Sequence, residues 1–313
     1  MLDLNLLEKE LDYALDNETS ESLSDWLKKQ RNMHIGQKKY RDFIVGEKIY
    51  SVADFIFSTN FVENNNEDYN RQQNTFDINK LKEYNIVYLH TMYKNQFFNL
   101  IKDLDNKFTV VTHNSDINID NIDNLPKNVV TWYSQNIKYR DDRLHSLPIG
   151  LENSKWFPYI QKQSKMQNKL NNVKNHRNLV YINHNVNTNL KERVEPYDLL
   201  NGKKFVTIEF GRNGQDFDHY IDNIYNHKFV ICPEGNGIDT HRKWETLYLN
   251  SIPIEKRSIN NSYYEDLPIC FVESWEEITE DFLNKEYERI MSTEWNLDKL
   301  DMTYWKNEIS KYE

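Results

Sequence analysis

The segment His227–Arg257 constrains the fold of this chain more than any other stretch of its 313 residues. It opens with a short apolar run, FVIC at 229–232, of the kind that forms a buried parallel strand. A loop with two glycines follows, then a helical pattern, then a second apolar run at Ile252–Ile254. The helical side chains that would pack on a sheet share one face: Trp244, Leu247, Tyr248 and Ser251. The segment therefore predicts a strand–loop–helix–strand unit, and such units bind ligands at the loop.

The loop and the first turn of the predicted helix carry groups that suit an anion. Gly235 and Gly237, on either side of Asn236, allow positive φ and a close approach by a ligand. Asp239 or Thr240 can cap the helix. The N–H groups of a helix N-terminus, together with the helix dipole, favour a phosphate or diphosphate. We therefore predict an anion-binding site at this loop.

Two charged residues of the predicted helix extend this site. Arg242 lies in the first turn, where its guanidinium can bind a phosphate through two hydrogen bonds. Glu245 lies three residues further on the same side, where its carboxylate can accept both hydroxyls of a ribose. Together they predict a nucleotide-sugar site. Residue types alone leave an alternative open, in which Arg242 and Glu245 form an ordinary exposed pair and the glycines only make a turn.

The stretch FVICPEGNGIDTHRKWETLYLNSIPI resembles the donor-binding segment of the exostosin-like glycosyltransferases, including their ribitol xylosyltransferase branch. That family carries a CP-x-G…R-x-x-E-A-L…G-x-I-P pattern. The positions that match it here are Cys232, Pro233, Gly235, Arg242, Glu245, Leu247, Ile252 and Pro253. Thr246 and Asn250 depart from it, standing where an alanine and a glycine are usual. The resemblance implies a GT-B fold, a nucleotide-sugar donor that we expect to be UDP-linked, and inversion at the anomeric carbon by direct displacement.

Residues 43–150 alternate short apolar runs with helical segments, as an α/β domain does. Polar residues follow two of these runs, and residues just beyond strand ends are where an open α/β sheet places its site. Strands are predicted at Ser51–Phe57, Ile86–Leu89, Phe108–Val111 and Val129–Trp132, with a helix at Asn95–Leu104.

The polar stretch THNSD, at 112–116, also resembles viral and bacterial proteins of the exostosin-like group, as does HSLPIGLE at 145–152. In such a transferase the attacking acceptor hydroxyl needs a base. Asp116 is the first candidate and His113 the second, while His90 and Asn114 are candidates on the acceptor side. Because Asn-Ser-Asp is also good turn chemistry, a role for Asp116 as a loop cap stays open.

The length of the chain favours two domains. We predict an α/β fold of GT-B type, in which two Rossmann-like domains face a cleft and helices from both ends of the chain pack on the body. Residues 1–152 would form the acceptor and base domain, beginning with a helix over 1–30. Residues 153–177, rich in Lys, Gln and Asn, would be a linker, and residues 178–313 would bind the nucleotide sugar.

Two features of the C-terminal half bear on this arrangement. Arg193, at the end of a polar loop that runs into a helix, is placed to reach the donor phosphates. The alternative is a surface arginine paired with Glu192 or Glu195. The helical pattern of Ile278–Lys311 is expected to end in a helix that crosses back to the first domain, with its tryptophans as anchors.

The distribution of charge along the chain does not identify the acceptor. The chain carries a formal net charge of −10, yet Lys28–Arg41 and Lys155–Arg177 are basic and free of acidic residues. These stretches predict either a solvated face and a flexible linker or a patch for a polyanion. The acceptor is accordingly expected to be either a glycan or a hydroxymethylated DNA base, as in phage DNA modification.

The expected location is the cytoplasm, of a host cell if the source is viral. No apolar run approaches the length of a membrane span, and no signal-peptide pattern is present, so no membrane partner is expected. Cys232 and Cys270 are expected to be buried thiols, which fits a reducing compartment.

No metal site is predicted. The two D-x-D matches, Asp103–Asp105 and Asp216–Asp218, do not follow an apolar strand, and no Cys or His cluster has zinc spacing. We therefore expect an enzyme that needs no metal and no cofactor besides the nucleotide sugar, with Arg242 and Arg193 stabilising the departing diphosphate. Two other classes stay open: a nucleotide-sugar-binding protein without catalysis, and a metal-dependent GT-A transferase.

Overall fold

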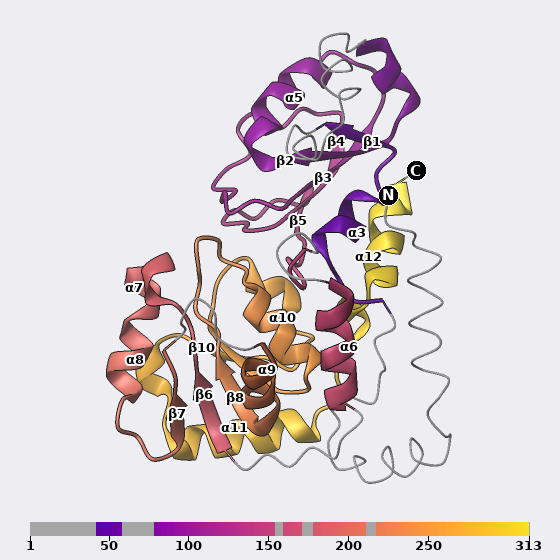
Figure 1. Cartoon of the computed structure of the whole chain (residues 1–313). Coiled ribbons are helices and arrows are strands. Elements are labelled where there is room, and N and C mark those ends of the chain that lie inside the picture. The colour runs from indigo at the N-terminus through magenta and orange to yellow at the C-terminus, as the bar shows by residue number, and fades with distance from the viewer. Residues whose placement is uncertain (1–41, 58–77, 154–158, 171–177, 211–216, 313) are drawn as a thin grey trace.

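A computed structural model describes residues 42–57, 78–153, 159–170, 178–210 and 217–312 (Figure 1). The predicted helix over 1–30 and the basic stretch Lys28–Arg41 lie outside these residues. The described chain forms two α/β units, each built on a five-stranded parallel sheet. The predicted fold class, two parallel α/β domains facing a cleft, is confirmed.

The N-terminal sheet has its strands in the order of the sequence. All neighbours are parallel, and the order is β1-β2-β3-β4-β5. The apolar runs form these strands because both faces of a parallel sheet are covered, so that every residue of β3 is buried. The strands are β1 (Phe55–Phe57), β2 (Ile86–His90), β3 (Phe108–His113), β4 (Val129–Ser134) and β5 (Leu144–Ser146).

Helices of this unit are short. They are α3 (Gly46–Tyr50), η2 (Ile78–Glu83), η3 (Thr91–Tyr93) and α5 (Lys94–Ile101). The strand predicted over Ser51–Phe57 is wrong in its first half. Ser51 follows α3 and its hydroxyl donates to the carbonyl of Lys48 at 2.7 Å, so the chain turns here and extends only from Phe55.

The C-terminal sheet reverses direction within its strand order. Its order is β10-β9-β8-β6-β7, and all neighbours are parallel. The strands are β6 (Asn178–Ile182), β7 (Val206–Ile208), β8 (His227–Ile231), β9 (Ile252–Lys256) and β10 (Cys270–Val272). The chain therefore moves one way from β6 to β7 and the other way from β8 to β10. An open α/β sheet binds ligands at such a switch point, here between β6 and β8.

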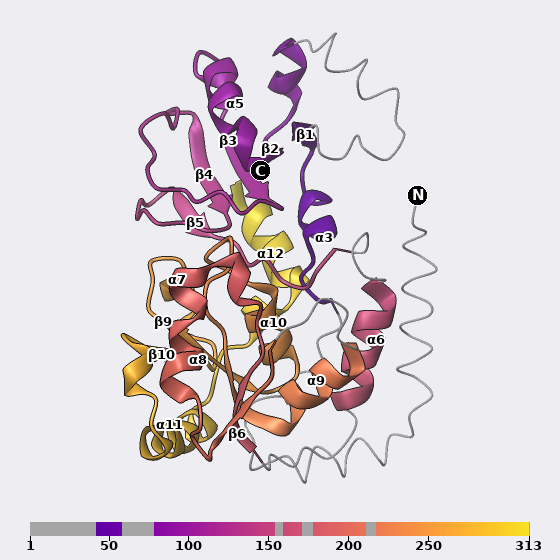
Figure 2. The same ribbon diagram turned by 60° about the vertical axis from the view of Figure 1, so that its left-hand side comes forward.

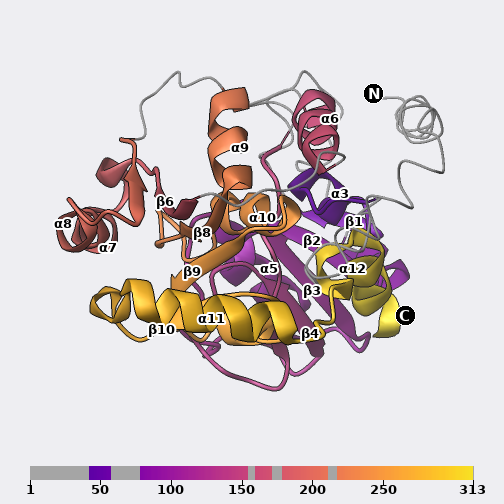
Figure 3. The ribbon, with the colours of Figure 1, turned by 90° about the horizontal axis from the view of Figure 1, so that it is seen from below.

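Helices cover both faces of this sheet, as Figure 3 shows with α11 on one side and α9 and α10 on the other. The main helices are α7 (Leu190–Arg193), α8 (Glu195–Leu200), α9 (Phe217–Asn226), α10 (His241–Tyr248), α11 (Glu280–Ser292) and α12 (Met302–Ile309). Short 3-10 turns lie between them: η4 (Val186–Thr188), η5 (Asn261–Tyr264), η6 (Trp275–Glu277), η7 (Asp298–Leu300) and η8 (Ser310–Tyr312). The strand–loop–helix–strand unit predicted at 227–257 is confirmed as β8, α10 and β9.

The segment between the two units, predicted as a linker over 153–177, contains helix α6 (Tyr159–Leu170). This helix lies beside α9 (Figure 2), and two of its lysines form ion pairs there. Lys165 pairs with Asp218 at 2.8 Å, and Lys169 pairs with Asp222. Local pairing therefore occupies these two charges of the basic stretch Lys155–Arg177, which argues against their use for a polyanion.

Helix α12 packs on the N-terminal unit, beside α3 (Figures 1 and 2). The Met302 N–H donates to the Asp42 carbonyl at 2.8 Å, and the Tyr133 hydroxyl donates to the Glu308 carbonyl at 3.0 Å. Trp305 of this helix is buried in an apolar cluster that also includes Trp244 of α10. Burying a large apolar side chain contributes roughly 1.5–3 kcal/mol to the free energy of folding. The shared core therefore holds the two units together.

Two further expectations concern cysteines and membranes. Cys232 and Cys270 are both free and buried, which confirms that they are buried thiols. Within the described ranges, no helix is both long and apolar enough to cross a membrane.

Candidate functional site

A cleft of about 270 Å³ opens at the switch point of the C-terminal sheet. Asp116 and Ile149 line it from the N-terminal unit. The other lining residues follow β6 or β8 or lie on α9: Thr188, Arg193, Tyr220, Gly235, Asn236, Gly237, Asp239, Thr240, His241, Arg242 and Glu245. The structure thus brings together Asp116 and every residue predicted to bind the donor. It leaves His90, His113 and Asn114 outside the cleft lining.

Two residues at the N-terminus of α10 that line this cleft, Thr240 and Arg242, carry unsatisfied polar atoms. Thr240 is the N-cap residue, but its side chain makes no capping hydrogen bond. Its Oγ1 is buried without a hydrogen-bond partner among the described residues, and so is Nη1 of Arg242. Buried polar atoms in a folded protein are nearly always hydrogen-bonded. Two unpartnered ones at a helix N-terminus are therefore groups whose hydrogen bonding a bound anion can complete.

The two loop glycines are needed for close contacts and not for positive φ. Neither Gly235 nor Gly237 is among the positive-φ residues, so that part of the prediction is wrong. A Cβ on Gly235 would lie 2.7 Å from Nη2 of Arg193, and a Cβ on Gly237 would lie 2.7 Å from Nδ2 of Asn136. The loop is glycine-rich because side chains from β6–α7 and from the N-terminal unit pack directly on its backbone.

Arg193 lines the cleft and holds the glycine loop in place through hydrogen bonds. Its Nε donates to the carbonyl of Glu234 at 2.8 Å, and its Nη1 donates to the carbonyl of Asn185 at 2.9 Å. Asn189 adds a hydrogen bond from its Nδ2 to the carbonyl of Gly235 at 3.0 Å. Burial and the nearby Arg242 lower the pKa of Arg193 to about 10. Two guanidinium groups that repel one another form a site that a bound anion stabilises.

Glu245 forms the inner wall of the cleft and is 4% exposed. Its Oε2 accepts a hydrogen bond from the Tyr220 hydroxyl at 2.7 Å. The guanidinium of Arg242 lies over the same tyrosine ring, with Cζ 5.2 Å from the ring centroid. The alternative in which Arg242 and Glu245 only form an ordinary exposed pair is therefore wrong, because Glu245 is buried and accepts a hydrogen bond from Tyr220. The role of Tyr220 could not be predicted from the sequence, because its apolar neighbours on α9 make it look like a core residue.

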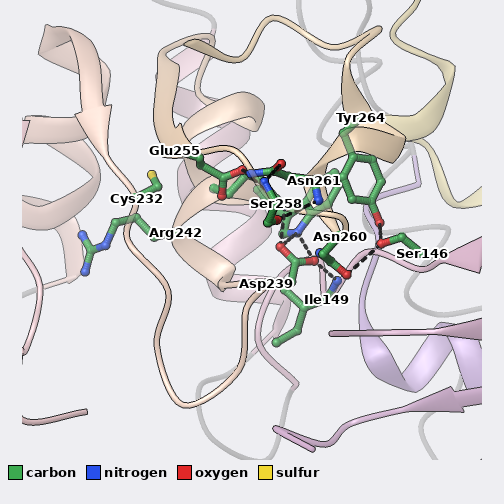
Figure 4. A network of polar contacts seen from close by, with 12 residues as sticks. Ser146, Ile149, Cys232, Asp239, Arg242, Glu255, Ser258, Asn260, Asn261 and Tyr264 are labelled. Carbon is green, nitrogen blue, oxygen red and sulfur yellow. Dashed lines mark hydrogen bonds and ion pairs between the residues drawn. The ribbon is translucent and has the colours of Figure 1, made fainter. Parts of the chain in front are cut away.

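Asp239 borders the cleft, but its carboxylate joins the two units and does not cap α10 (Figure 4). Oδ2 accepts from the Ile149 N–H at 2.8 Å and from Trp244 Nε1 at 2.9 Å. Oδ1 forms an ion pair with Lys243 Nζ at 2.7 Å. The Asp239 N–H in turn donates to Oδ1 of Asn136 at 2.9 Å. Of the two predicted cap residues, Thr240 occupies the N-cap position and Asp239 does not. The Asp239 carboxylate, buried among these partners, positions the loop instead.

This network continues on the side of the loop that faces away from the cleft. The Nζ atom of Lys243 lies 3.7 Å from Oε2 of Glu255, and both residues are buried. Burial, opposed by Lys243, raises the pKa of Glu255 to about 7. Ser146 donates to Asn260 Oδ1 at 3.1 Å and hydrogen-bonds the Tyr264 hydroxyl at 2.9 Å (Figure 4). Arg242 points away from these residues (Figure 4). Neighbouring residues of α10 therefore differ in role: Arg242 lines the cleft, and Lys243 lies at the interface between the two units.

Asp116 lies in the loop after β3 and is exposed. It is the carboxylate that the N-terminal unit contributes to the cleft lining, which Thr188 and Arg193 also help to form. The turn that contains it is held by its neighbours, because Ser115 Oγ accepts from the Ile117 N–H at 3.1 Å. The alternative role of Asp116 as the cap of this turn is therefore not supported.

His113 and Asn114 hold the loop in place. His113 is fully buried, and its Nε2 lies 2.9 Å from the carbonyl of Pro148. Burial lowers the pKa of His113 to about 4. Asn114 has φ 55°, donates to the Tyr88 hydroxyl at 3.2 Å and accepts from Asn153 at 2.9 Å. A buried, neutral imidazole bonded to the backbone cannot reach a substrate, which argues against His113 as the base.

His90 ends β2 beside β3, and its register partner is His113. Its Nδ1 accepts a hydrogen bond from the Met92 N–H at 3.4 Å and so caps η3. Burial lowers the pKa of His90. Since His90 does not line the cleft, the structure gives it a capping role and does not bring it to the acceptor side.

Within the described ranges, no group of three or more His, Cys, Asp or Glu side chains could hold a metal ion. Of the two D-x-D matches, Asp103–Asp105 follows α5, and Asp216 lies outside the described residues. The charged groups that the cleft offers a ligand are the two guanidiniums and the carboxylates of Asp116 and Glu245.

No protein-family model and no curated protein matches this chain. Among solved structures the chain is similar to an alpha,alpha-trehalose-phosphate synthase (UDP-forming) from Burkholderia vietnamiensis. The two share 9% sequence identity over 71% of this chain and 69% of that chain, with a TM-score of 0.36. The functional assignment therefore depends on the site itself.

Proposed function

We propose that the protein is a glycosyltransferase that uses a nucleotide sugar, expected to be UDP-linked, and transfers one sugar to an acceptor hydroxyl. The observation that carries the proposal is the pair of buried, unpartnered groups at the N-terminus of α10, Thr240 Oγ1 and Arg242 Nη1. Both residues line an open cleft that Arg193 also lines. A diphosphate would supply the acceptor oxygens that these donors lack.

The donor would lie along the carboxyl ends of β6 and β8. Its diphosphate would contact the loop 235–240 and Arg242, and its ribose would contact the carboxylate of Glu245, as the exostosin-like resemblance implies. This arrangement stabilises the departing diphosphate with a helix N-terminus and two guanidiniums. No metal is needed for that charge balance, and we propose that the enzyme works without one.

Asp116 is the proposed base. It faces the donor groups from the other unit and is exposed, so an acceptor can reach it. As the bond from the anomeric carbon to the diphosphate oxygen breaks, the acceptor oxygen bonds to that carbon from the opposite side and its proton passes to the Asp116 carboxylate. The anomeric configuration inverts in a single displacement. A glycan hydroxyl and a hydroxymethylated DNA base both fit this chemistry.

A donor panel tests the proposal. Thermal shift and slow donor hydrolysis would be measured with UDP-, GDP- and ADP-sugars, each with and without EDTA. We expect one UDP-sugar to raise the melting temperature and to be hydrolysed slowly, with no change on adding EDTA. Failure of every nucleotide to stabilise the protein would contradict the proposal, and loss of activity in EDTA would contradict its metal independence.

A further inference from the structure

Tyr220 lies between the two charged residues proposed to bind the donor. It comes from α9, outside the strand–loop–helix unit that carries the other donor groups. Its hydroxyl donates to Glu245 Oε2 at 2.7 Å, and the Arg242 guanidinium lies over its ring at 5.2 Å. All three side chains line the same cleft.

We propose that Tyr220 is a positioning residue that fixes the ribose-binding and diphosphate-binding halves of the donor site relative to one another. Its hydroxyl orients Glu245, and its ring orients Arg242. The inference rests on the proposed function, because that function assigns the ribose to Glu245 and the diphosphate to Arg242.

The geometry explains why a tyrosine serves here. Glu245 is buried and lies one helical turn from Arg242, so the two would tend to pair directly and remove both from a ligand. A ring under the face of the guanidinium stabilises its charge without using the N–H groups, which point out from the edge of that plane. Nη1 of Arg242 is left without a partner among the described residues. The donors of Arg242 thus remain available for a phosphate.

The hydroxyl acts on the carboxylate in a complementary way. It donates one hydrogen bond to Oε2 and so sets the plane of the Glu245 carboxylate. Burial, opposed by Arg242 and reinforced by Glu245, raises the pKa of Tyr220 well above its ordinary value. The hydroxyl therefore keeps its proton and stays a donor at any working pH.

The test separates the two halves of the ligand by using UDP and inorganic pyrophosphate as probes in titration calorimetry. Tyr220→Phe keeps the ring and loses the hydroxyl. We expect its Kd for UDP to rise about tenfold, because a Glu245 carboxylate that Tyr220 no longer orients binds the ribose hydroxyls less well. Its Kd for pyrophosphate should stay within about twofold, because the ring under Arg242 remains. Tyr220→Leu, which removes the ring as well, should weaken both probes.

A double-mutant cycle with Glu245→Ala tests whether Tyr220 acts through Glu245, because alanine cannot accept the Tyr220 hydrogen bond. If Tyr220 does act in this way, Tyr220→Phe/Glu245→Ala binds UDP no more than about twofold more weakly than Glu245→Ala alone. Tyr225→Phe is the matched control, because Tyr225 lies on the same helix but in the core, and it should leave both affinities unchanged. If Tyr220→Leu does not fold, the measurements on Tyr220→Phe and the double-mutant cycle still test the positioning role of Tyr220.

Three results would overturn the inference: UDP binding by Tyr220→Phe equal to wild type, equal losses for UDP and pyrophosphate in that variant, or full additivity in the cycle. A wild-type protein that binds none of UDP, GDP and ADP contradicts the proposed function itself. A wild-type protein that binds UDP while Tyr220→Phe is unaffected contradicts only the positioning role.

Discussion

The two sheets of this protein have the same number of strands and differ in how the chain connects them. In the N-terminal sheet each strand is followed by its neighbour, whereas the C-terminal sheet reverses between β6 and β8. All but two of the residues that line the cleft come from the second unit, and the exceptions are Asp116 and Ile149. The reversal separates the loops after β6 and β8 and leaves a crevice that the sequential sheet lacks. Strand connection, more than residue composition, decides which unit can hold a ligand.

The units also differ in what their polar residues do. In the N-terminal unit, His113, Asn114 and His90 are occupied by bonds within the protein, and Asp116 alone of the predicted residues there reaches the cleft. In the C-terminal unit, Thr240 and Arg242 retain unpartnered polar atoms. The first unit is therefore expected to contribute to the reaction and the second to binding.

The largest expected effect follows from this division. Asp116→Asn should lower turnover by about 10²–10⁴-fold, the usual contribution of a positioned base. The affinity for UDP should not change, since Asp116 faces the donor groups from the other unit. Steady-state kinetics and calorimetry on the same preparation measure both. Turnover like that of wild type would show that another group takes the proton.

A pair of glycine substitutions distinguishes the binding function of the loop from its structural function. Gly237→Ala places a Cβ against Asn136, which donates to the carbonyl of Ser115 and accepts from the Asp239 N–H. It should lower the free energy of unfolding by about 1–3 kcal/mol, the cost of overpacking a tight contact.

Gly235→Ala is the matched substitution on the same loop. Its Cβ meets the end of the Arg193 side chain, which can move, so stability should change little. Nucleotide affinity should fall several-fold because the displaced guanidinium borders the cleft. Chemical denaturation and UDP titration of both variants make the comparison. Equal effects of the two variants on both quantities would show that the loop does not divide its functions in this way.

The smallest effect concerns pH. The pKa of Glu255 is raised to about 7 in the folded protein, above the ordinary value of a glutamate. The folded state therefore binds this proton more tightly than the unfolded state, so stability falls as pH rises through the range from about 4.5 to 7. Glu255→Gln should remove that contribution, so that its stability relative to wild type increases across the range. Denaturant unfolding at several pH values measures the difference, and a constant difference would contradict the raised pKa.

Much of the C-terminal unit could be predicted from the sequence, because its signals are local. The apolar run of β8, the glycine loop and the one-sided pattern of α10 all lie within a few residues of one another, and each agrees with the others. The strands β5 and β10 were not predicted, because each has three residues and too little pattern to recognise.

The parts of the site that could not be predicted depend on contacts between distant residues. Asp239 accepts from Ile149, which lies 90 positions away in the chain, and Tyr220 reaches Glu245 from a different helix. The types of these residues fit several roles, such as capping for Asp239 and core packing for Tyr220. Tertiary contacts select among those roles: a contact between the two units for Asp239, and a contact between α9 and α10 for Tyr220.

Binding of UDP to wild type and to Arg242→Gln, measured by titration calorimetry in the presence of EDTA, tests most directly whether the N-terminus of α10 binds the diphosphate. We expect wild type to bind UDP without metal and Arg242→Gln to bind it about 10–100-fold more weakly, with an unchanged melting temperature of the free protein. Equal affinity of the two proteins for UDP would show that the unpartnered groups at the N-terminus of α10 do not bind the diphosphate, and the proposed function would be contradicted.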